Sequence, residues 1–169
     1  LDAFESYSFN ALCCPATDAV TVGLFVNYAK RMRDTLGKKF QLCAIKPTAD
    51  YEGVIGVWNT AELNGTVSDA LVYWVTGAES NAAVNRSLTN TLYNGELTVD
   101  TAYTQSALES AVKAGKFMLH AVGDKVRVLC DINTLTTYTD KKSADFADNQ
   151  TVRICDQIAN DSAVLFNTR

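Results

Sequence analysis

The sequence has few prolines and glycines, a single histidine and no long apolar run, and each shortage excludes a class of protein. Two prolines and nine glycines occur among 169 residues, of which 47% are hydrophobic and 20% charged. This composition excludes a disordered chain, a collagen-like repeat and a Pro-rich linker. No apolar run approaches the roughly 18 residues of a membrane-spanning helix, so we expect no membrane partner.

An excess of positive charge is also missing. The chain carries 15 basic and 19 acidic residues, a formal net charge of −4. Proteins that bind nucleic acid by neutralising phosphates need the opposite sign, so we expect no nucleic-acid partner. The length is that of one domain with one core.

The cysteines follow no metal-binding or disulfide pattern. There are five, an odd number, at positions 13, 14, 43, 130 and 155. Zinc sites use closely spaced Cys pairs with further Cys or His ligands, and small secreted domains use an even count. We therefore predict buried, reduced thiols, as in a cytosolic protein, and no metal. The chain starts at Leu1 and stops at Arg169 inside a helical pattern, so we expect an excised piece of a longer polypeptide.

The first third of the chain has the pattern of a β-α-β unit. Apolar residues recur at helical spacing after Asp18, a candidate N-cap, and the helix is expected to stop at Gly37. Strands are predicted over residues 7–12 and 40–45, which favours a parallel pair. Residues 54–58 form a third apolar run typical of a strand buried on both faces.

The rest of the chain adds helices and a hairpin. We predict a helix from 66–69 to about Asn85, a short strand over 91–93, and a helix from Thr104 to Gly115. Alternating residues on both sides of Gly123 and Asp124 predict a β-hairpin with a type II′ turn. The last helix is expected to start at Asn149 and to bury one apolar stripe. That stripe consists of Val152, Cys155, Ile158, Ala159, Leu165 and Phe166.

Together these patterns predict an α/β or α+β fold. We expect a single domain, residues 1–169, with a mixed sheet of about six strands and about four helices packed on it. Trp58, Tyr73 and Trp74 lie in apolar surroundings and are predicted to be core residues.

The sequence has no recognisable catalytic or cofactor site. His120 would have to supply any general base alone, and no Gly-x-Ser-x-Gly or phosphate-loop pattern is present. We therefore predict no catalytic, cofactor-binding or metal-binding residues. A small hydrolase centred on His120 and a cytosolic binding module remain as alternatives.

Two clusters of charged residues match no catalytic or cofactor-binding motif. Arg31, Arg33, Lys38 and Lys39 lie at the end of the first helix, where cations complement the helix dipole. Asp131, Asp140, Asp145 and Asp148 border one loop. The clusters are interpreted as solvated surfaces, with pairing of 31–39 to 140–148 across subunits as the alternative.

Several segments resemble the contractile tail sheath proteins of phages and prophages of Gram-positive bacteria. The clearest are residues 50–59 (DYEGVIGVWN), 71–78 (LVYWVTGA) and 88–95 (LTNTLYNG). Shorter matches continue in order through 103–105, 114–117, 131–134, 157–161 and 165–167, and weaker ones are 7–10 and 30–33. The similarity therefore extends over nearly the whole chain.

This resemblance implies a structural, non-enzymatic role in a virion tail assembled in the bacterial cytoplasm. Subunits of that family polymerise around the tail tube, and contraction triggered at the baseplate drives the tube through the target envelope. The implied partners are other sheath subunits, the tube protein and the baseplate. The chain resembles the central body of a subunit without its terminal arms. By itself we expect it to be monomeric, with an open sheet edge.

Overall fold

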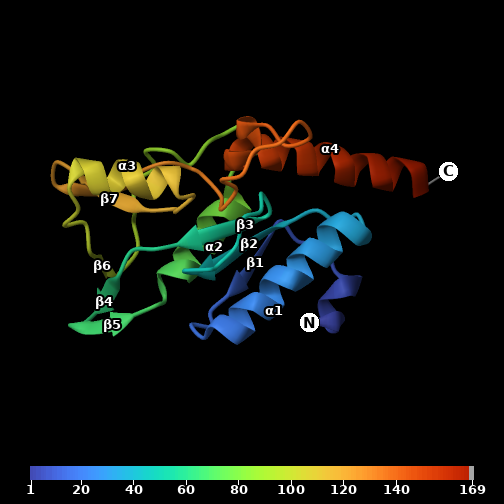
Figure 1. Ribbon diagram of the computed structural model, residues 1–169. Coiled ribbons are helices and arrows are strands. Elements are labelled where there is room, and N and C mark those ends of the chain that lie inside the picture. Colours follow the sequence, from blue (N-terminus) through green and yellow to red (C-terminus); the bar gives the residue numbers. More distant parts are fainter. Residues whose placement is uncertain (168–169) are drawn as a thin grey trace.

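A small parallel sheet forms the centre of the molecule in the computed structural model, which describes residues 1–167 (Figure 1). Its strands are β1 (Ala11–Cys14), β2 (Gln41–Ile45) and β3 (Val54–Val57), in the order β1-β2-β3. The first residues, Asp2–Ser6, form a 3₁₀ turn before β1. The predicted strands are thus confirmed, although the first begins four residues later than the predicted start at Tyr7.

The helix α1 (Ala19–Lys30) connects β1 to β2 as predicted. The Asp18 carboxylate accepts a hydrogen bond of 2.8 Å from the backbone N–H of Thr21 and so caps the helix. A π-helical turn, Arg31–Thr35, prolongs α1, and Gly37 follows with a φ of 72°. That left-handed conformation explains why a glycine ends the helix.

Helices cover both faces of this sheet. On one face the core consists of Cys14, Leu42, Ala44 and Val54 against Val22, Val26, Ala29 and Met32 of α1 and its π-helical turn. On the other face α2 (Leu71–Asn81) packs Leu71, Val72 and Val75 against Cys43, Ile45, Ile55 and Val57. Burial on both faces accounts for the nearly continuous apolar strands.

The two edges of the sheet differ. Beyond β3, Phe117 forms a parallel bridge with Val57, and the backbone N–H of Thr134 donates to the carbonyl of Val54 at 2.9 Å. Within residues 1–167 no strand pairs with the outer side of β1. The open edge expected from the sequence is therefore the β1 edge.

A second small sheet replaces the predicted start of the second helix. Strands β4 (Ala61–Leu63), β5 (Thr66–Ser68) and β6 (Thr98–Val99) are antiparallel in the order β5-β4-β6. Asn64 and Gly65 have positive φ values of 52° and 76° and form the tight turn between β4 and β5. Because this Asn-Gly turn was not recognised, the prediction of a helix from 66–69 was wrong. The helix α2 begins at Leu71, ends at Asn81 instead of near Asn85, and continues through Gly77.

The predicted third helix and the hairpin are confirmed. Thr104 caps α3 (Gln105–Lys113) by accepting from the N–H of Ala107 at 3.2 Å. Strands β7 (Leu119–Val122) and β8 (Lys125–Val128) form the hairpin, with Gly123 at a φ of 62°. The expected strand at 91–93 is reduced to a single bridge between Leu92 and Arg127.

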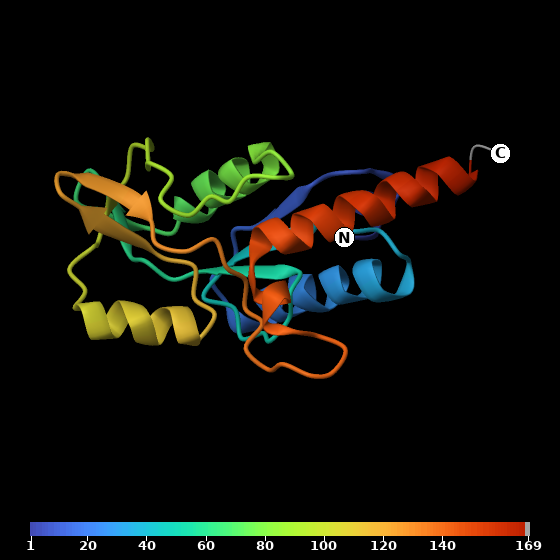
Figure 2. The ribbon, with the colours of Figure 1, turned by 90° about the horizontal axis from the view of Figure 1, so that it is seen from above.

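The last helix among the described residues is the long α4 (Asn149–Asn167), which follows a 3₁₀ turn, Ala144–Ala147. The helix starts at Asn149 as predicted, and Asp148 caps it by accepting a hydrogen bond of 2.8 Å from the backbone N–H of Thr151. In both views α4 extends beyond the sheet (Figures 1 and 2). The predicted class, α/β or α+β with about four helices, is confirmed. The prediction of a single mixed sheet was wrong, because β4 and β5 and likewise β7 and β8 pair with each other as local hairpins and do not join the parallel sheet. The strands of the described residues divide among three small sheets.

Candidate functional site

His120 lies in β7 opposite Arg127 and is half-buried. No hydrogen bond to its imidazole is found within residues 1–167, so the geometry assembles no catalytic pair around it. Over the same residues, no group of three or more His, Cys, Asp or Glu side chains is arranged to hold a metal. None of the helices described is both long and apolar enough to cross a membrane.

The most elaborate polar arrangement is a buried cluster that joins α2 to α4. It contains Glu79 of α2, Asn149 and Arg153 of α4, and Asp131, which follows β8. Arg153 forms ion pairs with Glu79 and, at 2.8 Å, with Asp131. The amide nitrogen of Asn149 donates to Asp131 at 2.8 Å and to Glu79 at 3.3 Å. The cluster thus ties the start of α4 to the body of the molecule.

The charges of this cluster do not balance. Glu79 and Asp131 are 2% and 1% exposed, and one guanidinium serves both carboxyl groups. Burial, followed by the charge of Asp131, raises the pKa of Glu79 well above its ordinary value. The interpretation of Asp131 as a solvated residue was therefore wrong.

A second anchor fixes the middle of α4. The guanidinium of Arg33 forms two hydrogen bonds with Asp156, of 2.5 and 2.9 Å, and also donates to the carbonyl of Phe40. One turn further along, the amide of Asn160 donates to the carbonyl of Lys39 at 3.0 Å. These contacts place α4 beside the amino end of β2.

The basic cluster at the end of α1 is therefore engaged within the chain. Arg33 is 4% exposed, which corrects its interpretation as part of a solvated face. Arg31 pairs with Glu5, and the ammonium groups of Lys38 and Lys39 donate to backbone carbonyls of Glu5 and Arg33. Burial of Arg33 is tolerated because the two carboxylate oxygens of Asp156 accept one hydrogen bond each from the two terminal nitrogens of its planar guanidinium.

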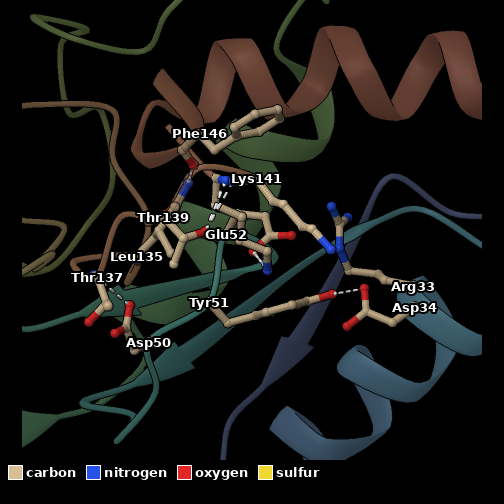
Figure 3. A network of polar contacts seen from close by, with 12 residues as sticks. Arg33, Asp34, Asp50, Tyr51, Glu52, Leu135, Thr137, Thr139, Lys141 and Phe146 are labelled. Atoms are coloured by element: carbon tan, nitrogen blue, oxygen red, sulfur yellow. Dashed lines mark hydrogen bonds and ion pairs between the residues drawn. The ribbon is translucent and has the colours of Figure 1, made fainter. Parts of the chain in front are cut away.

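A third polar network surrounds Tyr51, in the loop between β2 and β3 (Figure 3). Its hydroxyl donates to Asp34 at 2.7 Å, and Asp50 accepts from the N–H groups of Thr136 and Thr137 at 2.7 and 3.2 Å. Lys142 pairs with Glu52 of the same loop at 2.7 Å, and its ammonium lies 4.8 Å from the centre of the Tyr51 ring. Burial raises the pKa of the Tyr51 phenol. The network joins the 134–142 loop to the loop between β2 and β3, and Tyr51 of that loop contacts Asp34 at the end of the π-helical turn.

The acidic residues that border this loop differ in their surroundings. Asp148 caps α4, and Asp145 accepts from the hydroxyl of Ser143 at 3.1 Å. Asp140 is exposed. Asp145 is exposed as well, so the interpretation as solvated residues is confirmed for Asp140 and Asp145, whereas Asp148 is half-buried.

The outward face of α4 is apolar, contrary to the usual arrangement. Of the predicted buried stripe, Val152 is buried, but Cys155, Ile158 and Phe166 are exposed, the last two by 61% and 75%. The face turned to the body is mainly polar: beside Val152 it carries Asn149, Arg153, Asp156 and Asn160. The prediction that α4 buries its apolar stripe was wrong because charged side chains on the body pair with the polar face of α4, which is therefore the buried face. A second exposed apolar pair, Val20 and Leu24, lies on α1.

The aromatic predictions were correct only in part. Tyr73 is exposed, so its assignment to the core was wrong. Trp74 is half-buried against Tyr93, with ring centres 4.9 Å apart, and its N–H donates to Asn94 at 2.9 Å. Trp58 is half-buried, and the ammonium of Lys116 lies 4.2 Å from the centre of its ring.

An open groove of about 820 Å³ lies between α4, the 36–40 segment and the chain before β1. Phe9, Met32 and Phe40 line it together with Lys38 and Lys39. No carboxylate lines it among the described residues, and it contains neither a nucleophile paired with a base nor a ligand set. It has the character of a docking surface more than of an active site.

The buried ionic residues were not predicted from the sequence, although one signal was present. Glu79 lies four residues after Val75 and seven after Val72, on the apolar face of α2. A carboxylate on that face indicates a buried partner. The other charged members of the cluster are Asp131 and Arg153. They lie far from Glu79 in the sequence, so no local pattern identifies them.

Comparison with known proteins gives consistent matches. A family model described as the phage tail sheath protein central domain matches residues 1–134. The solved sheath tail protein from Desulfitobacterium hafniense is 40% identical with a TM-score of 0.91, over 98% of this chain and 41% of that chain. The phage-like element PBSX protein XkdK of Bacillus subtilis is 34% identical, over 95% of this chain and 36% of that protein.

A more distant match concerns the fold alone. The helical sheath of the anti-feeding prophage in its contracted state is 14% identical with a TM-score of 0.63, over 95% of this chain and 47% of that chain. In all of these comparisons the chain spans less than half the length of its relative.

Proposed function

Because this chain belongs to the phage tail sheath protein family, we propose that it is the central body of a contractile sheath subunit. In this proposal residues 1–169 are one domain of a longer protein that polymerises around a tail tube. The sheath contracts and drives the tube through the target envelope. The match of nearly the whole chain to the sheath tail protein of Desulfitobacterium hafniense is the observation that carries the proposal.

The proposed role is mechanical and requires no chemical step. A sheath subunit has to keep its own fold while its contacts with neighbours change. The sheet covered on both faces, with α4 anchored by buried ion pairs, suits such a rigid body. Membership of a family of structural tail sheath proteins supports a non-enzymatic role.

Several surfaces are available for self-association. Ile158 on α4 and the pair Val20 and Leu24 on α1 are exposed apolar side chains on different helices. When two different patches of one chain contact each other, the contact repeats from copy to copy and produces rings or helical polymers. The open edge of β1 offers backbone groups to an added strand. We propose these surfaces for contacts with neighbouring subunits, and the tube protein and baseplate as further partners in the virion tail.

Electron microscopy of the longer protein that contains this chain tests the proposal. We expect helical tubes at high protein concentration, while residues 1–169 alone remain monomeric in light scattering. Discrete particles of the longer protein under all assembly conditions, or a stable polymer of residues 1–169, would contradict it.

A further inference from the structure

The buried cluster between α2 and α4 has one more carboxylate than cations. Glu79, Asp131 and Arg153 contact one another within it, and Asn149 is 0% exposed. The Arg33–Asp156 pair further along α4 is balanced, with one charge of each sign. A net negative charge in the interior is costly, and binding of one proton removes it.

The hydrogen bonds indicate which carboxylate is less well stabilised. Asp131 accepts from the N–H of Leu88, from Asn149 and from Arg153, each at 2.8 Å. Glu79 accepts from Arg153 and has only a long contact of 3.3 Å with the same Asn149 amide. Three good donors favour the ionised form of Asp131, so Glu79 is the group that takes up the proton.

Among residues 1–167, Arg153 is the only cation that forms an ion pair with Glu79. Arg153 and Asn149 face it from α4, Asp131 from the segment after β8, and the buried thiol of Cys43 from β2. Arg86 contributes only its backbone carbonyl, which accepts from Arg153. The cluster therefore contains one positive and two negative groups.

We propose that Glu79 and Asp131 hold one proton between them and that this proton regulates how firmly α4 is seated on the body. When Glu79 is protonated, its hydroxyl donates to Asp131 and Arg153 neutralises the remaining charge. When Glu79 loses the proton, the two carboxylates repel each other at the base of α4. The contact between α2 and α4 is thus sensitive to the protonation of Glu79.

The direction of the pH effect follows from the raised pKa of Glu79, caused first by burial and then by the charge of Asp131. Below the ordinary pKa of glutamic acid, folded and unfolded chains are both protonated and the contribution of Glu79 is fully present. It declines as the pH rises through the pKa of the folded state. Between the ordinary pKa of glutamic acid and the pKa of Glu79 in the folded chain, the equilibrium constant for unfolding increases by up to about tenfold per pH unit. This slope corresponds to one proton.

The experiment combines a carboxyl-carbon NMR titration of the chain with urea unfolding from about pH 5 to about pH 8, the range in which a raised carboxyl pKa is resolved. Glu79→Gln is the test variant because glutamine imitates the protonated, neutral side chain. Glu109→Gln is the matched control, since Glu109 is exposed on α3 and accepts from Gln105 at 3.2 Å. Amide hydrogen exchange in α4, corrected for the intrinsic pH dependence, measures how stably this helix packs on the body.

We expect Glu79 to titrate well above the ordinary range of glutamic acid. Wild type and Glu109→Gln should lose α4 protection and stability as the pH rises through that value, and Glu79→Gln should not. A normal titration of Glu79, or the same pH profile for Glu79→Gln and wild type, would overturn the proposal. If Glu79→Gln does not fold, the titration of Glu79 and the exchange of α4 in the wild type decide the question.

Discussion

Arg33 and Asp156 lie 123 residues apart in the sequence and form a two-pronged ion pair in the interior, with N–O distances of 2.5 and 2.9 Å. The same guanidinium donates to the carbonyl of Phe40, just before β2. One pair of side chains thus connects the end of α1, the start of β2 and the middle of α4. It holds a helix whose outward face is apolar.

Removing one partner of this pair should be strongly destabilising. We expect Asp156→Ala to lower the free energy of unfolding by about 3–5 kcal/mol, because it leaves the guanidinium of Arg33 buried without a counter-charge. Urea unfolding measures the change. Asp161→Ala is the control, since Asp161 is exposed on the same helix and contacts Gln157. Equal effects of the two substitutions would show that the pair is not an anchor.

Two glycines should respond in opposite ways to the same substitution. Gly115 has a φ of 66°, and an added Cβ would lie 2.9 Å from the carbonyl oxygen of Asn133 and 3.0 Å from the Cα of Thr134. We expect Gly115→Ala to destabilise the fold by more than about 1 kcal/mol. At Gly23, in α1, an added Cβ meets nothing within 4 Å. Gly23→Ala should stabilise the fold by about 0.5–1 kcal/mol. Thermal unfolding of both variants checks the signs, and destabilisation by Gly23→Ala would refute the explanation.

The cap of α1 should make stability depend on pH in the acid range. The hydrogen bond from the backbone N–H of Thr21 lowers the pKa of Asp18. A lowered pKa means that the contribution of Asp18 is present above the ordinary pKa of aspartic acid and is lost as the pH falls through the folded-state value.

The Asp18→Asn variant separates the effect of the capping hydrogen bond from the effect of the negative charge of Asp18. We expect this variant to keep a capping oxygen and to lose the Asp18 part of the acid dependence, whereas Asp18→Ala loses the cap at every pH. Helix content followed by circular dichroism during an acid titration distinguishes the three proteins. An unchanged acid profile for Asp18→Asn would contradict the assignment.

The exposed apolar residues of α1 and α4 should matter for assembly and not for folding. We expect Leu24→Asp and Ile158→Asp to leave the unfolding free energy of residues 1–169 within about 0.5 kcal/mol of wild type, as is usual for surface positions. In the longer protein each should reduce the yield of tubes seen by electron microscopy. Asn85→Asp, at another exposed position, serves as the control. Normal assembly of both test variants would remove these two surfaces from the proposed contacts.

Local features of the fold were accessible from the sequence. Asp18 was predicted as a cap, Thr104 as the start of a helix, and Gly123 as part of a hairpin turn, because each acts on residues within a few positions along the chain. The tail sheath resemblance was also visible in the order of the segments. The start of α2 was missed, since the Asn64-Gly65 turn competes with a helix over the same residues.

The amino-acid sequence by itself determined the three strands of the central sheet, the parallel pairing of the first two, the caps at Asp18 and Thr104 and the family, because these depend on periodicity and on contacts between near neighbours. Only the tertiary structure decided that Glu79, Arg33 and Asp131 are buried and that α4 turns its polar face inward. An apolar stripe predicts the buried face of a helix only when the surface beneath it is apolar. Here α2, the end of α1 and the segment after β8 bring charged groups together under α4, so ion pairing determines which face is buried.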